Sequence, residues 1–120
     1  MPFQYLLTNL LVDIPGAQGA IFLDPEGEAV ELVSQRATPY ELKLEGAYHG
    51  ILLRKANRLA GLVGGGGLER LGIVGSAMQV ASRALKGGYY LVVVMEPGTS
   101  LALAGEAMTR TGEALNREIY

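Results

Sequence analysis

Residues 89–95 read Tyr-Tyr-Leu-Val-Val-Val-Met and are apolar at almost every position. A β-strand that is covered on both faces has this composition, whereas a strand with one face in water alternates apolar and polar residues. Lys86-Gly87-Gly88 forms a turn before the run, and Pro97-Gly98 breaks the sheet after it. The sequence therefore predicts a central β-strand at this point.

Four more strands are predicted from shorter runs. Residues 20–23 have few polar interruptions and indicate another central strand. The sequence Asp-Pro-Glu-Gly at residues 24–27 has turn chemistry, so residues 28–34 pair with the preceding strand as a hairpin. Residues 68–76 and 79–85 alternate apolar and polar side chains. The central strand is expected in the middle of the sheet with the hairpin on one side of it. Residues 68–76 are therefore expected at a sheet edge.

Three segments carry helix signals. Apolar side chains recur at spacings of three and four through residues 3–14, and Pro15-Gly16 ends the pattern. Residues 38–41, Thr-Pro-Tyr-Glu, combine a capping Thr, a Pro at the first helical position and a Glu that closes a capping box. They predict a helix from residue 39 to about residue 63. Thr or Ser at residues 99–100 can cap a last helix that reaches the C-terminus.

The predicted element order is helix, two strands, helix, three strands, helix. This order indicates an α/β (α+β) sandwich with one five-stranded antiparallel sheet. At 120 residues the chain is expected to form a single domain, residues 1–120, with a core of its own.

Composition excludes several classes of function. Ten basic and twelve acidic residues give a net charge of −2 without any long run of one sign, which argues against nucleic-acid binding. The chain has no cysteine and one histidine, His49, so thiolate and histidine-rich metal sites are not expected. No stretch approaches a membrane span of about 20 apolar residues, and the start of the chain does not resemble a secretory signal. A cytoplasmic protein is the expectation.

The glycine run at residues 64–67 is the most conspicuous candidate for a ligand site. A phosphate-binding loop follows a strand and opens a helix, usually with a Lys-Ser/Thr pair, whereas here a helix precedes the run and a strand follows it. A flexible connection with a left-handed helix cap is the better interpretation. His49 is expected in an interface or on the surface, and Ser76 lies at a strand end without a nearby acid or base in sequence. No catalytic residue, cofactor site or metal site is predicted.

The middle helix has an unusually wide apolar surface. On a helical wheel, apolar side chains spread over about twice the arc of roughly 100° that packing on a sheet requires, and glycines border that arc. Glycine inside a helix costs about 1 kcal/mol relative to alanine, so the close approach of another backbone, from the sheet or from a second helix, is expected to offset it. One interpretation is a subunit interface, and the alternative is a helix that its own fold buries completely.

An edge strand with few charges supports the subunit interface. Two such strands could pair across a two-fold axis and bring the two middle helices side by side. The predicted dimer interface comprises Gly46, Gly50, Leu53, Asn57, Gly61, Leu71 and Ile73. The predicted contacts with a different partner protein are Tyr48, Ile51, Leu52 and Lys55.

Two stretches carry a resemblance to a known family. Residues 14–27, Ile-Pro-Gly-Ala-Gln-Gly-Ala-Ile-Phe-Leu-Asp-Pro-Glu-Gly, and residues 88–95, Gly-Tyr-Tyr-Leu-Val-Val-Val-Met, together with the element order, resemble the Roadblock family. This family includes dynein-type light chains and bacterial MglB-like regulators of small GTPases. The resemblance covers nearly the whole chain. It implies a profilin-like three-layer sandwich and a homodimer whose sheet is continuous through the third strand.

The resemblance also implies a function without catalytic residues. Members of the family typically act on Ras-like small GTPases, in some cases by reshaping the switch loops of the GTPase, or serve as scaffolds. The expected function is a homodimeric regulatory or adaptor module that binds a Ras-like small GTPase and modulates its nucleotide cycle. The alternative is a scaffold subunit of a larger complex with no role toward a GTPase. A third class, an enzyme or small-molecule sensor, would need a convergent polar pocket for which the sequence offers no residues.

Overall fold

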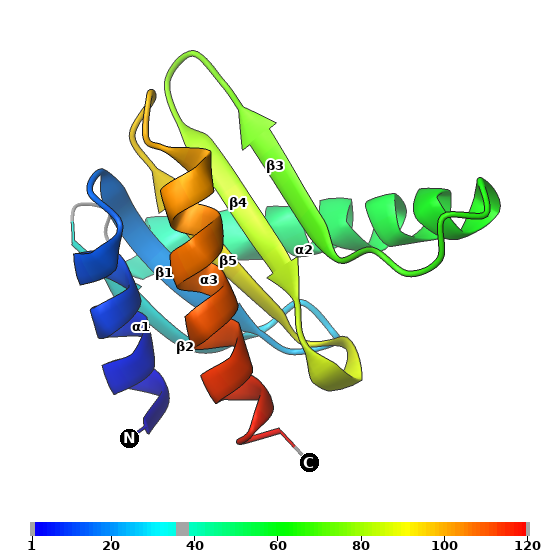
Figure 1. Ribbon diagram of the computed structural model, residues 1–120, viewed down its shortest axis with the longest axis horizontal. Helices are drawn as coiled ribbons and strands as arrows, with labels where there is room; N and C mark the ends of the chain where they lie inside the picture. Colours follow the sequence, from blue (N-terminus) through cyan, green and yellow to red (C-terminus); the bar gives the residue numbers. More distant parts are fainter. Residues whose placement is uncertain (1, 36–38, 120) are drawn as a thin grey trace.

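The computed structural model describes residues 2–35 and 39–119, without the side chains of residues 2, 39, 40 and 42–47. The predicted element order is confirmed (Figure 1). The elements are α1 (Pro2–Asp13), β1 (Ala17–Leu23), β2 (Ala29–Ser34), α2 (Pro39–Leu62), β3 (Arg70–Val74), β4 (Gln79–Ala84), the short 3-10 helix η1 (Lys86–Gly88), β5 (Tyr90–Met95) and α3 (Leu101–Asn116).

The strands form one antiparallel sheet in the order β2-β1-β5-β4-β3. β5 lies in the middle, between β1 and β4, as its apolar sequence predicts, and residues 91–95 are buried. β3 is an edge strand that pairs only with β4, as predicted. The sheet places the most apolar strand at its centre and leaves the least protected strand at its rim.

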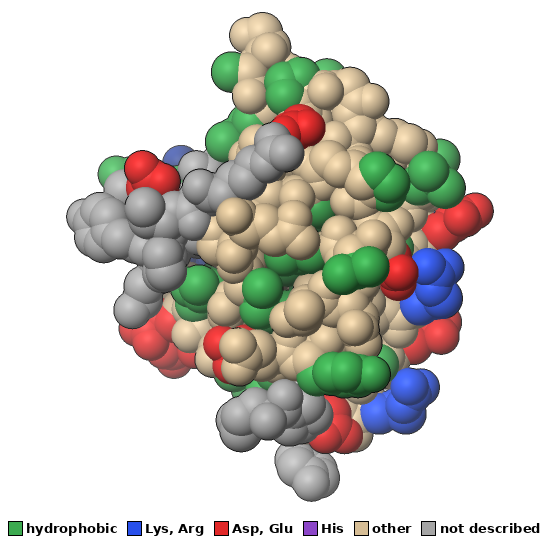
Figure 2. Space-filling view, turned by 90° about the vertical axis from the view of Figure 1, so that its left-hand side faces the viewer, with side chains coloured by type: hydrophobic (Ala, Val, Ile, Leu, Met, Phe, Trp, Pro, Cys, Tyr) green, Lys and Arg blue, Asp and Glu red, His purple; other side chains and the backbone are tan. Residues whose placement is uncertain are grey.

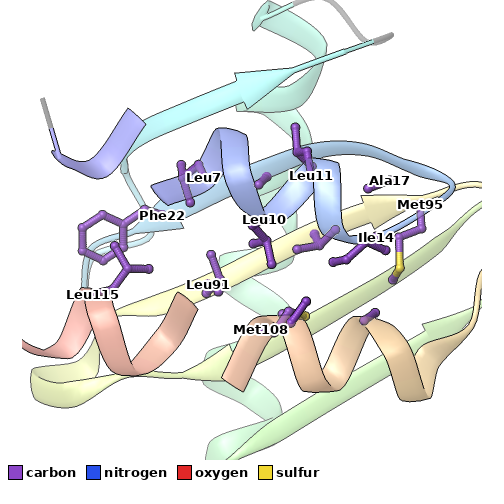
Figure 3. Packing of buried hydrophobic residues seen from close by; sticks show 14 of the residues in the cluster. Leu7, Leu10, Leu11, Ile14, Ala17, Phe22, Leu91, Met95, Met108 and Leu115 are labelled. Atoms are coloured by element: carbon purple, nitrogen blue, oxygen red, sulfur yellow. The ribbon is translucent and has the colours of Figure 1, made fainter. Parts of the chain in front are cut away.

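Helices cover both faces of the sheet and make a three-layer sandwich. α1 and α3 lie side by side on one face, and α2 crosses the other face (Figure 1). The core under α1 and α3 takes side chains from both helices and from alternate positions of β1 and β5 (Figure 3). It includes Leu7, Leu10, Ile14, Phe22, Leu91, Val93, Met95, Ala104, Met108 and Leu115.

The second core lies between the sheet and α2. Its buried residues are Ile21, Leu23, Leu53, Val80, Val92 and Val94, of which only Leu53 comes from the helix. α2 packs against β1 and β2, and Figure 1 shows its C-terminal turns extending past the β3 edge of the sheet. Among the described side chains of α2, Leu53 is the one that joins this hydrophobic core.

Turn and cap residues act as the sequence indicates. The Asp24 carboxylate accepts the backbone N–H groups of Glu26 and Glu28, which closes the β1–β2 turn. Ser100, rather than Thr99, caps α3 by accepting the N–H of Leu103. The predicted cap at Thr38 lies outside the described residues.

The glycine run closes α2 with a left-handed C-terminal cap. Gly64 has a positive φ of 76°, and the Gly65 N–H donates to the Ala60 carbonyl at 2.7 Å while the Gly64 N–H donates to the Gly61 carbonyl at 3.2 Å. This pair of bonds is the Schellman arrangement, which satisfies carbonyls at the end of a helix. The run is thus a helix cap that returns the chain to β3, as the sequence predicts.

Candidate docking surface

Gly50 and Leu53 of α2 face the chain's own sheet and its β1–β2 turn. A Cβ placed on Gly50 would lie 3.2 Å from Gly27 Cα in the β1–β2 turn, and Leu53 is 1% exposed in the second core. The prediction that Gly50 and Leu53 contact a second subunit is therefore wrong. Their surroundings are intramolecular, and the backbone that approaches the helix glycine belongs to the same chain.

His49 also faces the sheet, which corrects its predicted place in an interface or on the surface. It is buried beside Ser82 of β4, and His49 Nε2 forms a hydrogen bond with Ser82 Oγ. Burial lowers the pKa of His49, because a charged imidazole loses hydration there. Both side chains are buried, so this hydrogen bond connects α2 to β4, and the Ser82 hydroxyl is not accessible as a nucleophile.

The opposite side of α2 presents an exposed apolar stripe. Tyr48 is 67% exposed and Ile51 and Leu52 are also exposed, as contact with a partner requires. Lys55 lies in the same stripe and is exposed. At 3.6 residues per turn these positions share one face, which points away from the face that holds His49 and Leu53. The four residues are accessible, and their role in binding remains a prediction.

The stripe continues further than the predicted set. Leu59 and Leu62 follow Lys55 at spacings of four and three, and Leu62 is 75% exposed. Val63, the first residue after the helix, has an equally exposed side chain. The spacing of three and four that relates Tyr48 to Leu52 also relates Leu59 and Leu62 to Lys55, so the sequence contains a signal for these two positions.

The edge strand β3 adds a second exposed apolar element. Val74 is 68% exposed and Ile73 is 36% exposed, and the outer edge of β3 pairs with no strand among the described residues. Leu71 instead packs against the second core, so its side chain is already half-buried within the chain. We define the α2–β3 surface as Tyr48, Ile51, Leu52, Lys55, Leu59, Leu62, Val63 and Ile73. Val74 lies at the same strand edge, but on the face of the sheet that also holds Gly72.

The other predicted interface positions have mixed surroundings. Asn57 Oδ1 accepts the Leu68 N–H at 2.7 Å and so ties the loop after the glycine run to α2. Gly61 is open, because a Cβ there would meet nothing within 4 Å. The surroundings of Gly46 lie outside the described part of the chain. Asn57 and Gly61 therefore remain available at the end of α2 that extends past the sheet.

Exposed apolar side chains elsewhere are more dispersed. Figure 2 shows the side of the molecule at the left of Figure 1, next to α1, where hydrophobic side chains stand in small separate groups. Tyr5 and Val12 on α1 and Val30 on β2 are the large exposed ones of these elements. Scattered single residues of this kind are usual on a protein surface, whereas a stripe beside an unpaired strand edge is typical of an interaction site.

The described residues contain neither a metal-binding cluster nor a membrane-spanning helix. Across residues 2–35 and 39–119, no three His, Cys, Asp or Glu side chains come close enough together to hold a metal ion. In the same ranges, no helix has both the length and the apolar character needed to cross a membrane. The α2–β3 surface consists of exposed apolar side chains, Lys55 and the unpaired edge of β3.

Comparison with known proteins reveals similarity in fold. No protein-family model and no curated protein matches the sequence. A Roadblock/LC7 domain from Streptomyces avermitilis superposes with a TM-score of 0.85 at 16% identity, over 95% of this chain and 94% of that chain. The gliding protein MglB from Thermus thermophilus gives a TM-score of 0.86 at 20% identity, over 97% of this chain and 87% of that chain.

MglB from Myxococcus xanthus superposes equally well, with a TM-score of 0.86 at 16% identity, over 98% of this chain and 86% of that chain. The similarity extends over nearly all of the chain in each case, so it includes the helices on both faces and the β3 edge. It confirms the three-layer architecture that the Roadblock resemblance implies. This chain has the fold of the Roadblock/LC7 domains and of MglB.

Proposed function

We propose that this chain forms a cytoplasmic homodimer that binds a Ras-like small GTPase and modulates its nucleotide cycle. The α2–β3 surface is the observation that carries the proposal. It joins an unpaired strand edge to an exposed apolar helix face on a chain whose fold is that of MglB. The sequence resemblance to Roadblock-type GTPase regulators supports the same function.

The dimer contact is assigned to β3 and the end of α2. Pairing of two β3 strands would satisfy their free N–H and C=O groups and cover Ile73 and Val74 near a two-fold axis. Because α2 extends past β3 in Figure 1, its last turns would then lie against the partner subunit. Those turns carry Leu59 and Leu62 on one side and the bare Gly61 on another, which permits close helix contact.

The GTPase contact is assigned to the part of the stripe over the sheet. Tyr48, Ile51 and Leu52 present apolar area, and Lys55 adds a positive charge at its end. A tyrosine flanked by aliphatic residues is typical of the small group of side chains that dominates binding energy in an interface. Any change in GTP hydrolysis would come from repositioning residues of the GTPase, as the Roadblock resemblance implies.

The test measures binding and single-turnover GTP hydrolysis with small GTPases from the same genome. Tyr48→Ala combined with Ile51→Asp should weaken binding by about a hundredfold or more, the effect of removing two dominant contacts. Val12→Asp is the matched control, because Val12 is equally exposed but lies on α1. If no GTPase from that genome binds the wild-type dimer in either nucleotide state, the GTPase function is wrong and the scaffold alternative takes its place.

A further inference from the structure

A second site lies on the face of the sheet opposite to α2. A cavity of about 150 Å³ opens between α3 and the strands β3 and β4. It is lined by Arg70, Gly72, Arg83, Leu101, Gly105 and Met108, among others. None of these residues belongs to the α2–β3 surface, so the cavity is separate from the proposed GTPase contact.

Two glycines keep this cavity open. A Cβ on Gly72 of β3 or on Gly105 of α3 would meet nothing within 4 Å. Neither residue has a positive φ, so any side chain suits its backbone. Glycine weakens both helices and strands relative to other residues, and here neither packing nor turn geometry requires it. Free space at these two positions is what the glycines provide.

Two arginines stand at the rim of the cavity without an acidic partner. Arg70 and Arg83 are directly opposite each other in the β3–β4 register, an arrangement that is destabilising for like charges. Arg83 Nε is buried and has no hydrogen-bond partner, while Arg83 Nη1 lies 3.4 Å from Thr109 Oγ1. Among residues 2–35 and 39–119 neither guanidinium forms an ion pair, although Glu69 lines an adjoining polar cavity of about 350 Å³.

The size and lining of the cavity define its occupant. A volume of about 150 Å³ is below the roughly 300–1,000 Å³ of sites for whole small molecules, but it accommodates one apolar side chain. Leu101 and Met108 supply an apolar wall, and paired guanidinium groups bind carboxylates with charge-assisted hydrogen bonds. A peptide with an apolar side chain next to a carboxylate fits both the apolar wall and the two guanidinium groups.

We propose that this cavity docks an acidic segment of a partner protein. The segment inserts one apolar side chain between Gly72 and Gly105 and places a neighbouring carboxylate on Arg70 and Arg83. The positive charge of the two arginines favours the carboxylate, and the cavity between the two glycines favours the apolar side chain. This site is distinct from the proposed GTPase contact, since it uses the other face of the sheet, although Arg70 and Gly72 belong to β3, the strand assigned to the dimer contact.

NMR titration of the ¹⁵N-labelled full chain tests the proposal. The probes are blocked peptides of the form Glu-Glu-X-Glu-Glu, in which X is Leu, Met, Ile or Phe. At least one should shift the amide signals of Gly72 and Gly105 together with the Arg83 Nε–H signal. The same peptide with Ala or with Lys at X should bind at least about tenfold more weakly, which corresponds to losing the apolar anchor.

Variants separate this site from adventitious binding. Gly105→Leu fills the hollow and leaves both arginines in place, and Arg83→Met removes one guanidinium; each should weaken the peptide at least about tenfold. Arg110→Gln, at an exposed arginine of α3 beside Asp13, is the matched control and should bind as the wild type does. Titrations with acetate and with inorganic phosphate show whether an anion alone produces the same shifts. The proposal is overturned if no peptide shifts these signals, if the Ala peptide binds equally well, if Gly105→Leu has no effect, or if the free anions alone reproduce the shifts.

Discussion

Gly50 of α2 lies against Gly27 of the β1–β2 turn, so closely that a Cβ on Gly50 would approach Gly27 Cα to 3.2 Å. Gly27 has a positive φ of 86° in a turn that the Asp24 carboxylate closes, so its position is fixed by local bonds. Two backbones thus touch without side chains between them. This contact and the buried side chain of Leu53 determine how closely α2 packs on the sheet.

Replacing Gly50 with leucine should lift α2 from the turn and destabilise the chain. Leucine improves helix propensity by nearly 1 kcal/mol, but overpacking at a backbone contact costs about 1–3 kcal/mol or more. We expect a net loss of about 2 kcal/mol in the free energy of unfolding, measured by urea denaturation. Gly61→Leu is the matched control for the monomer, since a Cβ at that position of the same helix meets nothing within the chain, and it should be neutral or stabilising for the fold of the monomer. Equal effects of the two substitutions would contradict the assigned contact.

Acidification should weaken the contact between α2 and β4. Burial lowers the pKa of His49 in the folded chain from its ordinary value of 6.5, so the unfolded chain takes up the proton more readily. The contribution of His49 to stability is therefore complete above pH 6.5 and decreases as the pH falls from 6.5 toward the lowered native pKa. Urea unfolding at a series of pH values measures this decrease.

The control for this pH dependence is His49→Gln, which retains a hydrogen-bonding group beside Ser82 and does not titrate. Its free energy of unfolding should vary less with pH between neutrality and mild acid than that of the wild type. A wild-type profile that the substitution leaves unchanged would show that other groups cause the acid sensitivity.

Gln79 should stabilise the turn that leads into α3. Its side chain is buried, and it donates Nε2–H to the Thr99 carbonyl at 2.9 Å while Oε1 accepts the Gly98 N–H at 2.9 Å. Gln79→Ala leaves both backbone groups without this partner and should cost about 2 kcal/mol of unfolding free energy. Thr8→Ala, which removes an exposed hydrogen bond on α1, should cost much less. A loss at Gln79 no larger than at Thr8 would mean that water replaces both bonds.

Most of the fold could be predicted from local sequence patterns. The apolar run at Tyr90–Met95 predicts the central strand, and the turn at Asp24 and the glycine cap at Gly64 mark boundaries that the structure confirms. The edge position of β3 follows by elimination from the same patterns. These features depend on residues close together in the chain, which is why the sequence alone reveals them.

The orientation of α2 could not be predicted, because a helical wheel groups residues by face without saying which face meets the sheet. The sequence left open whether the sheet or a second helix approaches the glycines of α2, and the structure places Gly50, His49 and Leu53 on the sheet side. That choice depends on Gly27 and Ser82, which are far away in sequence. The cavity beside Arg83 was missed for a similar reason: the register that sets Arg70 opposite Arg83 exists only once β3 and β4 are paired.

A charge at the β3 edge should prevent self-association without unfolding the chain. Val74→Lys places an ammonium group on an exposed side chain at the unpaired edge, where it meets its own copy across the proposed two-fold axis. We expect at least about a hundredfold weaker dimerisation, with the unfolding free energy of the monomer changed by less than about 0.5 kcal/mol. Val30→Lys on the opposite edge strand, β2, is the matched control and should leave the dimer intact.

The most direct test of a β3-paired homodimer is the mass of the wild-type chain in solution. Sedimentation equilibrium at micromolar concentration should report a particle of twice the chain mass of 12.7 kDa, and the Val74→Lys chain should sediment as a single copy. A wild-type protein that stays at 12.7 kDa over the whole micromolar range would contradict the account.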